Sequence, residues 1–481
     1  MIEESISHKT IRTSFWAAIE HFSVIGVHFV VSLILARLLS PSDFGTIAML
    51  TIFIEISSNF VSCGFGNALI RKQDCCSEDF STAFYFNVFV GVVMYVLLWV
   101  IAPLVSDFYN IEILCPLLRW CGLTIIINSF SIVQNSILSK GLLAKKQARI
   151  HVFGSLLSAV VGITMAYVGC GIWSLVGQQL SSSIVITSTL WLTSSYRPRL
   201  EYSKKSMNYL WGFGSKILLS KIIGTIYKNI YSIVIGKFYT NSVLGLFNRG
   251  QSLSQLFPTI VESIFVKNSL AIFSQLQNDN EKLIHVYREY IKLSCFLCFP
   301  AVCLIGALAA PFVDFVLTDK WSGCVIYIKI FALTSFIIPA NSINLRLLQT
   351  YGRSDYTLKA EAIKKSLGLL LVFSLVPLGP LYLAIGKSLF DIFAFSVNLY
   401  YAKKVSELRF KDQIKDIIPI LLCSIIMYLV VTISIVPFTY SLVKMIVGAI
   451  VGVASFYVCG RYIFKLSQFD QIRKQLYAHK R

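Results

Sequence analysis

Apolar stretches of membrane-spanning length follow one another along almost the whole of this 481-residue chain. Of its residues, 56% are hydrophobic and only 14% are charged, whereas a soluble domain carries about 25% charged residues. A helix needs about 20 largely apolar residues to cross a bilayer, and a membrane β-barrel would instead show short segments of alternating hydrophobicity. The sequence therefore predicts an all-α integral membrane protein.

We predict about fourteen transmembrane helices, because that many apolar stretches are separated by short polar segments. The first six cover about 13–36, 41–65, 82–105, 113–138, 148–168 and 171–193. The second six cover about 209–235, 242–266, 287–317, 322–349, 357–378 and 380–401. A final pair covers about 416–436 and 440–463, and the tail that follows is basic.

The fourteen predicted helices assign each connecting segment to one side of the membrane. Lysine and arginine residues are unequally divided between the two sides. With the N-terminus in the cytoplasm, almost all of them fall in cytoplasmic segments, and the external side keeps only Arg37, Lys237 and Lys320. Cytoplasmic loops carry such an excess in membrane proteins. We therefore expect both termini in the cytoplasm, and we assign the net charge of +19 to this asymmetry and not to nucleic-acid binding.

A polar segment between the first two stretches, Ala36 to Thr46, returns 200 residues later in weaker form, from Gly236 to Leu246. Six stretches separate the copies, so both face the external side and the halves are parallel repeats about an axis along the membrane normal. We expect two six-helix lobes around a central cavity, followed by an extra helix pair with a basic tail. The predicted lobes are 1–200 and 201–404, and the appended part is 405–481.

The repeat also predicts an external gate or hinge, with one copy of the segment in each lobe. The candidate gate residues are the pairs that the 200-residue shift aligns: Arg37 with Lys237, and Gly45 with Gly245.

The seventh stretch carries three lysines. A charged residue in an apolar stretch costs about 2.5–3.5 kcal/mol on insertion scales, so it normally faces a cavity or a partner. Lys221 and Lys228 are seven residues apart, about two helical turns, and share one face, whereas Lys216 lies on another face nearer the cytoplasm. The lysines predict a site for an anionic substrate; the alternative, above all for Lys216, is that they reach out to the lipid headgroups.

Two arginines extend this candidate substrate site. Arg249 enters the eighth stretch from the external side, and a guanidinium suits phosphate or carboxylate groups. A salt bridge to Glu262 is not expected, because thirteen residues on one helix place the two on different faces. Arg119 lies near the external end of the fourth stretch, where contact with the headgroups is the alternative.

Three carboxylates within the stretches are candidates for coupling transport to protons or sodium ions: Glu20, Glu55 and Glu262. The alternative for Glu20 and Glu55 is a fixed ion pair with a lysine of the other lobe. Lys387 and Asp391, four residues apart, are expected to pair with each other. No metal site or other cofactor is expected, since the 12 cysteines lack matching histidines and no phosphate-binding loop is present.

The segment Ala36-Arg-Leu-Leu-Ser-Pro-Ser-Asp-Phe-Gly45 resembles the signature of bacterial polysaccharide flippases, of the multidrug/oligosaccharidyl-lipid/polysaccharide exporter superfamily. The resemblance covers roughly residues 10–400 and is best to the colanic-acid and teichuronic-acid branch. Further similar segments are Phe265 to Asp279, Phe299-Pro300, Ala310-Pro311, Lys320-Trp321 and Tyr351 to Asp355. The second copy departs from the signature, with Asn241-Ser-Val in place of Pro-Ser-Asp.

The resemblance implies a non-enzymatic flippase in the bacterial cytoplasmic membrane. Its substrate would be an undecaprenyl-pyrophosphate-linked oligosaccharide repeat unit, moved from the inner to the outer leaflet by alternating access. The cavity cations would meet the pyrophosphate while the lipid tail stays among membrane lipids. A polysaccharide polymerase and chain-length proteins are the implied partners.

Two alternatives remain at this point. A cation-coupled multidrug exporter of the same fold would favour carboxylates over cations in its cavity. A membrane polymerase or ligase acting on the same glycolipid would need a sizeable external loop, and the longest external segment in the sequence, about 106–113, is short.

Overall fold

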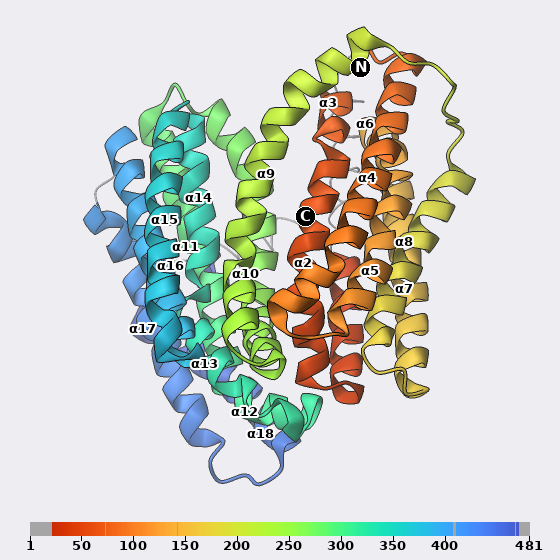
Figure 1. Ribbon diagram of the computed structural model, residues 1–481. Helices are drawn as coiled ribbons and strands as arrows, with labels where there is room; N and C mark the ends of the chain where they lie inside the picture. The colour runs from red at the N-terminus through yellow and green to blue at the C-terminus, as the bar shows by residue number, and fades with distance from the viewer. Residues whose placement is uncertain (1–21, 73, 142, 407–409, 467, 471–481) are drawn as a thin grey trace. The chain divides into compact units, whose positions relative to one another are not determined.

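The computed structural model describes residues 22–72, 74–141, 143–406, 410–466 and 468–470, and these residues form helices and connecting segments without a strand. They fall into two compact units, Met1–Gly245 and Leu246–Arg481 (Figure 1). The boundary between the predicted lobes, at residue 200, is drawn from the sequence repeat and differs from the boundary between these units. The predicted lobes therefore stay a prediction.

The first helix that the structure describes in this unit is the apolar helix Phe22–Leu38. A hydrophobic cluster lies where α3, α4, α6 and α9 meet, around Phe65 and Phe84. The following helices are α2 (Pro41–Ser62), α3 (Phe65–Arg71), α4 (Ser77–Tyr109), α5 (Leu114–Ser129), α6 (Ile132–Lys140), α7 (Ala144–Tyr167), α8 (Trp173–Thr193) and α9 (Lys204–Phe238). Helix α10 (Asn241–Gln275) starts in this unit and continues in the second.

The repeated polar segment contains the start signal of a helix in both copies. The Ser40 hydroxyl accepts a hydrogen bond from the Asp43 backbone N–H, and the Asp43 carboxylate accepts one from the Ser40 N–H at 2.9 Å, with Pro41 in the first helical turn. This is a capping box, which satisfies N–H groups that have no partner within the helix. In the second copy the Thr240 hydroxyl accepts a hydrogen bond from the Val243 N–H at 3.4 Å. Each copy therefore ends one helix and starts the next.

The segment between α8 and α9 is fixed to the first turns of α4. The Arg199 N–H donates to the Ser81 hydroxyl at 3.1 Å, and the Ser203 N–H donates to the Thr82 hydroxyl at 3.0 Å. The Tyr196 hydroxyl also lies 3.1 Å from that of Ser81. These bonds explain why α9 begins beside the first turns of α4.

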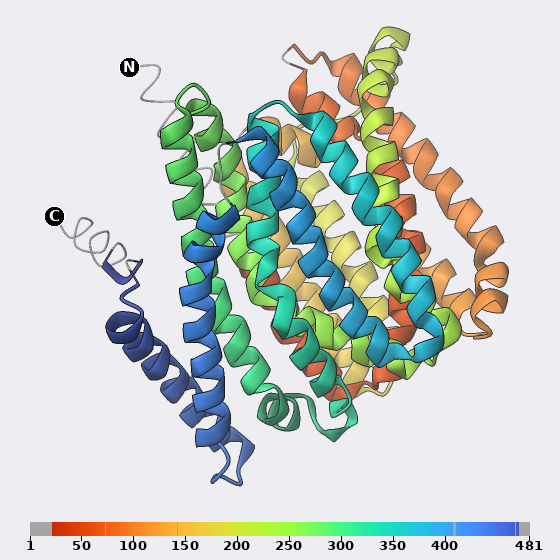
Figure 2. The same ribbon diagram turned by 90° about the vertical axis from the view of Figure 1, so that its left-hand side faces the viewer.

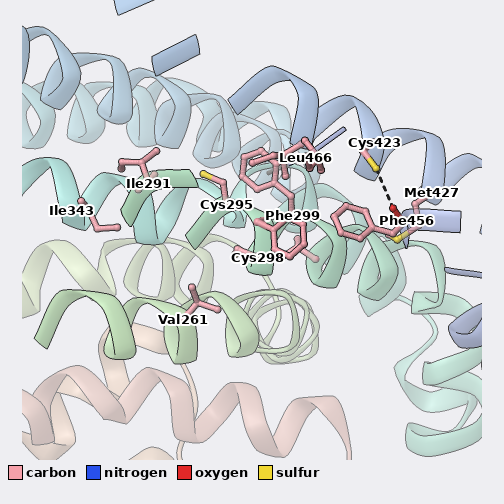
Figure 3. Close-up of a cluster of buried hydrophobic side chains, with 14 of the residues drawn as sticks. Val261, Ile291, Cys295, Cys298, Phe299, Ile343, Cys423, Met427, Phe456 and Leu466 are labelled. Atoms are coloured by element: carbon pink, nitrogen blue, oxygen red, sulfur yellow. Dashed lines mark hydrogen bonds between the residues drawn. The ribbon is translucent and has the colours of Figure 1, made fainter. Parts of the chain in front are cut away.

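The second unit is built on α11 and the helices that pack around it, and the apolar side chains of this core are drawn in Figure 3. Figure 2 shows α17 and α18 as two long blue helices joined by a turn. The helices after α10 are α11 (Asn280–Ala307), α12 (Ala309–Phe312), α13 (Cys324–Ser335), α14 (Ile337–Thr350), α15 (Ser354–Leu375), α16 (Pro380–Val405), α17 (Phe410–Ser434) and α18 (Ser441–Val458).

A buried polar cluster joins α17 to the helices before it. The Tyr287 hydroxyl of α11 donates to the Asn344 side chain of α14 and accepts from the Gln413 amide of α17 at 3.1 Å. The next residue of α11, Arg288, donates two hydrogen bonds from its guanidinium to Asp416 of α17, at 2.7 and 3.0 Å. Because buried polar groups are costly unless they are paired, this cluster fixes where α17 packs.

Nine helices of the described residues are long and apolar enough to cross a membrane, or ten if the bent pair α5 and α6 forms one span. This confirms the all-α membrane class, whereas the count of about fourteen is not confirmed. Helices α8, α10 and α15 lie on predicted stretches, but they carry too many polar or charged residues to qualify.

Replacing Tyr287 by Phe should lower the thermal stability of the purified protein. The change removes a buried hydroxyl and leaves the Asn344 and Gln413 side chains short of a partner, which costs about 1–3 kcal/mol. Tyr290→Phe on the same helix is the matched control, since no hydrogen bond of the Tyr290 hydroxyl is found among the described residues. Equal melting temperatures for the two variants would contradict a stabilising role of the cluster.

Candidate functional site

Helices α2 and α9 pack antiparallel, and polar contacts follow one another along their contact line. In the first half of α2, Met49 lies against Gly236 close to the end of α9. Further along, the Asn59 amide donates to the Thr225 hydroxyl at 2.8 Å. As the residue number rises along α2, that of its partner falls along α9. The lysine-bearing helix is thereby aligned with α2 over most of its length.

The centre of this contact line holds a carboxylate with two donors. The Lys228 ammonium donates to one Glu55 oxygen at 2.9 Å, and the Asn229 amide donates to the other at 2.8 Å. Asn229 is only 7% exposed and also donates to the Thr225 carbonyl, so it is held in place. By contrast, 70% of the Lys228 side chain and 32% of the Glu55 side chain are exposed. The sequence left two roles open for Glu55, and the structure shows the ion pair with a lysine of the seventh stretch.

The other two lysines predicted for the substrate site, Lys221 and Lys216, differ in how much of each the structure describes. Lys221 is exposed, and no ion pair or hydrogen bond joins it to any other described residue. Lys216 belongs to α9, but its side chain lies outside the described ones. The exposed cations that the structure describes on this helix within the apolar segment Ile217–Phe238 are therefore Lys221, Lys228 and, near the C-terminal end of the helix, Lys237.

The two copies of the repeated segment touch each other through their glycines. A Cβ atom on Gly45 would lie 1.8 Å from the Asn241 carbonyl oxygen, and one on Gly245 would lie 1.9 Å from the Pro41 carbonyl oxygen. The contact is reciprocal: Gly45 faces Asn241, and Gly245 faces Pro41, the residue that the 200-residue shift aligns with Asn241. The Asn241 amide adds a hydrogen bond to the Thr46 hydroxyl at 3.0 Å. Small residues allow such close crossings of helix backbones in membranes.

The basic residues of the two copies have separate environments. The Lys237 ammonium donates to the Phe108 carbonyl in the last turn of α4 and lies 4.5 Å from the centre of the Phe108 ring. A cation at a helix C-terminus satisfies a free carbonyl and opposes the helix dipole. Arg37 is exposed near the end of the helix Phe22–Leu38. Their role in a gate stays a prediction.

The two arginines stack on tryptophans. Arg249 is 7% exposed, and its guanidinium carbon lies 5.0 Å from the centre of the fully buried Trp321 ring. Arg119 of α5 lies 4.0 Å from the ring of Trp99 on α4. Stacking of this kind stabilises a guanidinium in an apolar environment. Arg119 thus has its aromatic partner on the neighbouring helix α4.

One of the other two predicted carboxylates, Glu262, has a partner within its own unit. Glu262 of α10 accepts a hydrogen bond from the Ser342 hydroxyl of α14, in the second unit. Glu20 lies outside the described residues. Lys387 and Asp391 pair with each other as expected, at 3.6 Å.

Sequence reasoning missed the polar residues that hold Glu55. Asn229 follows Lys228 directly, and Thr225 lies one turn earlier, so both were visible as polar side chains within an apolar stretch. A search restricted to charged residues overlooks such positions.

The family model described as polysaccharide biosynthesis protein matches residues 34–326, more than half of the chain. The chain belongs to this family. The resemblance expected from the repeated segment and the motifs after it is thereby confirmed.

Curated relatives share low identity with the chain over most of its length. Lipopolysaccharide biosynthesis protein WzxC of Escherichia coli is 23% identical over 367 residues, which cover 75% of this chain and 74% of that protein. Succinoglycan biosynthesis transport protein ExoT of Rhizobium meliloti is 25% identical over 350 residues, or 73% and 71% of the two chains.

Two solved structures show which fold this is. Lipid II flippase MurJ in an inward closed conformation aligns with a TM-score of 0.74 and 14% identity, covering 93% of this chain and 99% of that one. An inward-facing multidrug resistance MATE family transporter aligns with a TM-score of 0.65 and 15% identity, covering 80% and 97%. The chain therefore has the fold that these two structures share.

Replacing Gly45 by Ala should destabilise the protein, because the new Cβ would collide with the Asn241 backbone and force the two helix starts apart. Overpacking of this kind costs roughly 1–3 kcal/mol or more. We expect a lower apparent melting temperature in detergent, and a similar loss for Gly245→Ala.

Gly224→Ala on α9 is the matched control, since a Cβ there meets nothing within 4 Å. It should melt at or above the wild-type temperature, because alanine favours the helix. If the Gly45→Ala variant were as stable as this control, the backbones of α2 and α10 would not approach each other closely at these glycines.

Proposed function

We propose that this protein flips an undecaprenyl-pyrophosphate-linked oligosaccharide repeat unit from the inner to the outer leaflet of a bacterial cytoplasmic membrane. Support comes from membership of the polysaccharide biosynthesis protein family and from relatives named as biosynthesis and transport proteins. The fold shared with a lipid II flippase adds to this. These likenesses favour a transporter over an enzyme.

The observation that carries the proposal is the pair of exposed cations on α9, Lys221 and Lys228. An ammonium group in an apolar environment strongly attracts an anion, and a pyrophosphate is the charged part of such a lipid-linked substrate. The lipid tail would stay in the bilayer. Multidrug export is supported less well, since basic groups outnumber carboxylates among the candidate site residues.

Transport would proceed by alternating access, with the crossing of Gly45 and Gly245 at the external gate together with Arg37 and Lys237. Lys216, Arg119 and Arg249 stay in the proposal as further substrate-binding residues. A proton or sodium gradient would drive the cycle through Glu55, Glu20 or Glu262. Both termini would lie in the cytoplasm, and a polymerase with its chain-length proteins would use the product.

Depletion of the protein tests the direction of transport. Surface polysaccharide should disappear while lipid-linked repeat units accumulate in the inner leaflet, measured by their accessibility to a periplasmic glycosidase or labelling reagent. Unpolymerised units accumulating in the outer leaflet would instead assign the protein to polymerisation. Normal polysaccharide with increased drug sensitivity would favour a multidrug exporter.

Lys221→Ala should abolish complementation of the depleted strain at normal expression, because it removes an exposed cation from the proposed pyrophosphate site. For Lys228 the double variant Lys228→Met/Glu55→Gln avoids leaving the carboxylate unpaired, and it should fail as well. Lys204→Ala is the control: this lysine is exposed on the same helix but precedes the apolar segment Ile217–Phe238. Full complementation by both site variants would mean that the lysines only reach the headgroups.

A further inference from the structure

We propose that the second unit binds the headgroup of an anionic phospholipid between the turn that joins α14 to α15 and the end of α16. The site is a cluster of three cations, Arg353, Lys359 and Lys404, around the ring of Tyr356. The bound lipid would belong to the surrounding bilayer, and it is distinct from the lipid-linked substrate of the proposed function.

Helix packing fixes the position of the Tyr356 ring. Helices α14, α15 and α16 pack side by side (Figure 1). Each contributes one residue to a small buried core, Leu348, Ala360 and Tyr401, and Tyr356 packs against this core. The centres of the Tyr356 and Tyr401 rings are 5.4 Å apart. The ring therefore has a defined place where the three helices meet.

Three exposed cations surround this ring. The guanidinium carbon of Arg353 lies 3.9 Å from the ring centre, and the ammonium groups of Lys404 and Lys359 lie 5.4 and 5.7 Å from it. The face of an aromatic ring attracts a cation. Three like charges held around one ring nevertheless repel one another, and a bound anion would relieve this repulsion.

The cluster keeps an excess of positive charge. Arg353 donates two hydrogen bonds to the Asp355 carboxylate, both at 3.0 Å, so these two charges cancel. Among the residues that the structure describes, neither Lys359 nor Lys404 has an ion pair or a hydrogen bond. Three cations and one carboxylate leave two positive charges for a ligand.

Other charged residues close in the sequence do not cancel this excess. The Glu361 carboxylate accepts a hydrogen bond from the Lys364 ammonium, with which it forms an ion pair. Lys403, next to Lys404, adds another exposed cation. Glu407 and Arg409 lie outside the described residues and have opposite charges.

The place of the cluster favours a phospholipid over a phosphate ion from solution. The segments Cys324–Thr350 and Pro380–Val405 are long and apolar enough to cross a membrane, and both end at the cluster. Headgroup phosphates lie at this level of a bilayer, and basic groups there attract anionic lipids. Farther along, α15 and α16 expose large apolar side chains that acyl chains can cover, among them Leu358, Leu370, Phe373 and Leu389.

Equilibrium binding of radiolabelled dioctanoyl phosphatidylglycerol to the full-length protein in a neutral detergent tests the site. The double variant Lys359→Gln/Lys404→Gln should bind this lipid about thirtyfold more weakly than the wild type, roughly fivefold for each lysine removed. Both lysines are exposed, so the variant should keep the melting temperature of the lipid-free wild type. Dioctanoyl phosphatidylcholine, which has no net charge, should compete poorly.

Lys320→Gln/Lys444→Gln is the matched control, because it removes two lysines of the same unit away from the cluster. Lys320 precedes the segment Cys324–Thr350, whose other end carries the cluster, and Lys444 lies in the first turn of α18. This variant should keep the wild-type affinity for phosphatidylglycerol.

Equal affinities of the two double variants would overturn the proposal, because net charge and not the cluster would then determine binding. Phosphatidylcholine that competes as well as phosphatidylglycerol would also overturn it. Inorganic phosphate that displaces the lipid at equal concentration would assign the cluster to a free phosphate ion and not to a lipid. None of these results alters the evidence for or against flipping.

Discussion

The lack of water in the bilayer interior is the constraint on which this structure depends. A buried polar group on an apolar helix is costly unless the protein supplies its partner, because lipid cannot. The contact between α2 and α9 shows the result, with Asn59 bonded to Thr225, and Glu55 bonded to Asn229 and Lys228. These hydrogen bonds join defined positions on the two helices, so they align α9, which carries the lysines, with α2.

The same constraint acts at helix ends. Lys237 satisfies a carbonyl at the end of α4, and the Lys146 ammonium of α7 donates to the Thr193 carbonyl at the end of α8. Basic residues thus have a structural use besides setting the orientation of the chain in the membrane. A lysine of this protein therefore becomes a candidate for function through its exposure, as Lys221 does, and not through its charge alone.

The repeated segment combines two local properties that a membrane gate would need. Hydrogen bonds at Ser40 and Thr240 start α2 and α10 at defined residues, so each helix start is rigid. The glycines one turn later let the two backbones touch. A rigid and tightly packed contact can persist while the helices beyond it change their tilt. The copies differ, since Asp43 completes a capping box and Val243 does not.

The sequence by itself determined the all-α membrane class, the positions of most helices and the start of α2. These features depend on local patterns of hydrophobicity and on hydrogen bonds between neighbours in the chain. It also revealed the 200-residue repeat, but not that Gly45 and Gly245 touch. Only the tertiary structure decided that Glu55 pairs with Lys228 and that Arg249 stacks on Trp321. Helix packing decides which residues far apart in the sequence become partners. By charge alone, several lysines could have paired with Glu55, and only the packing of α9 along α2 brings Lys228 to it.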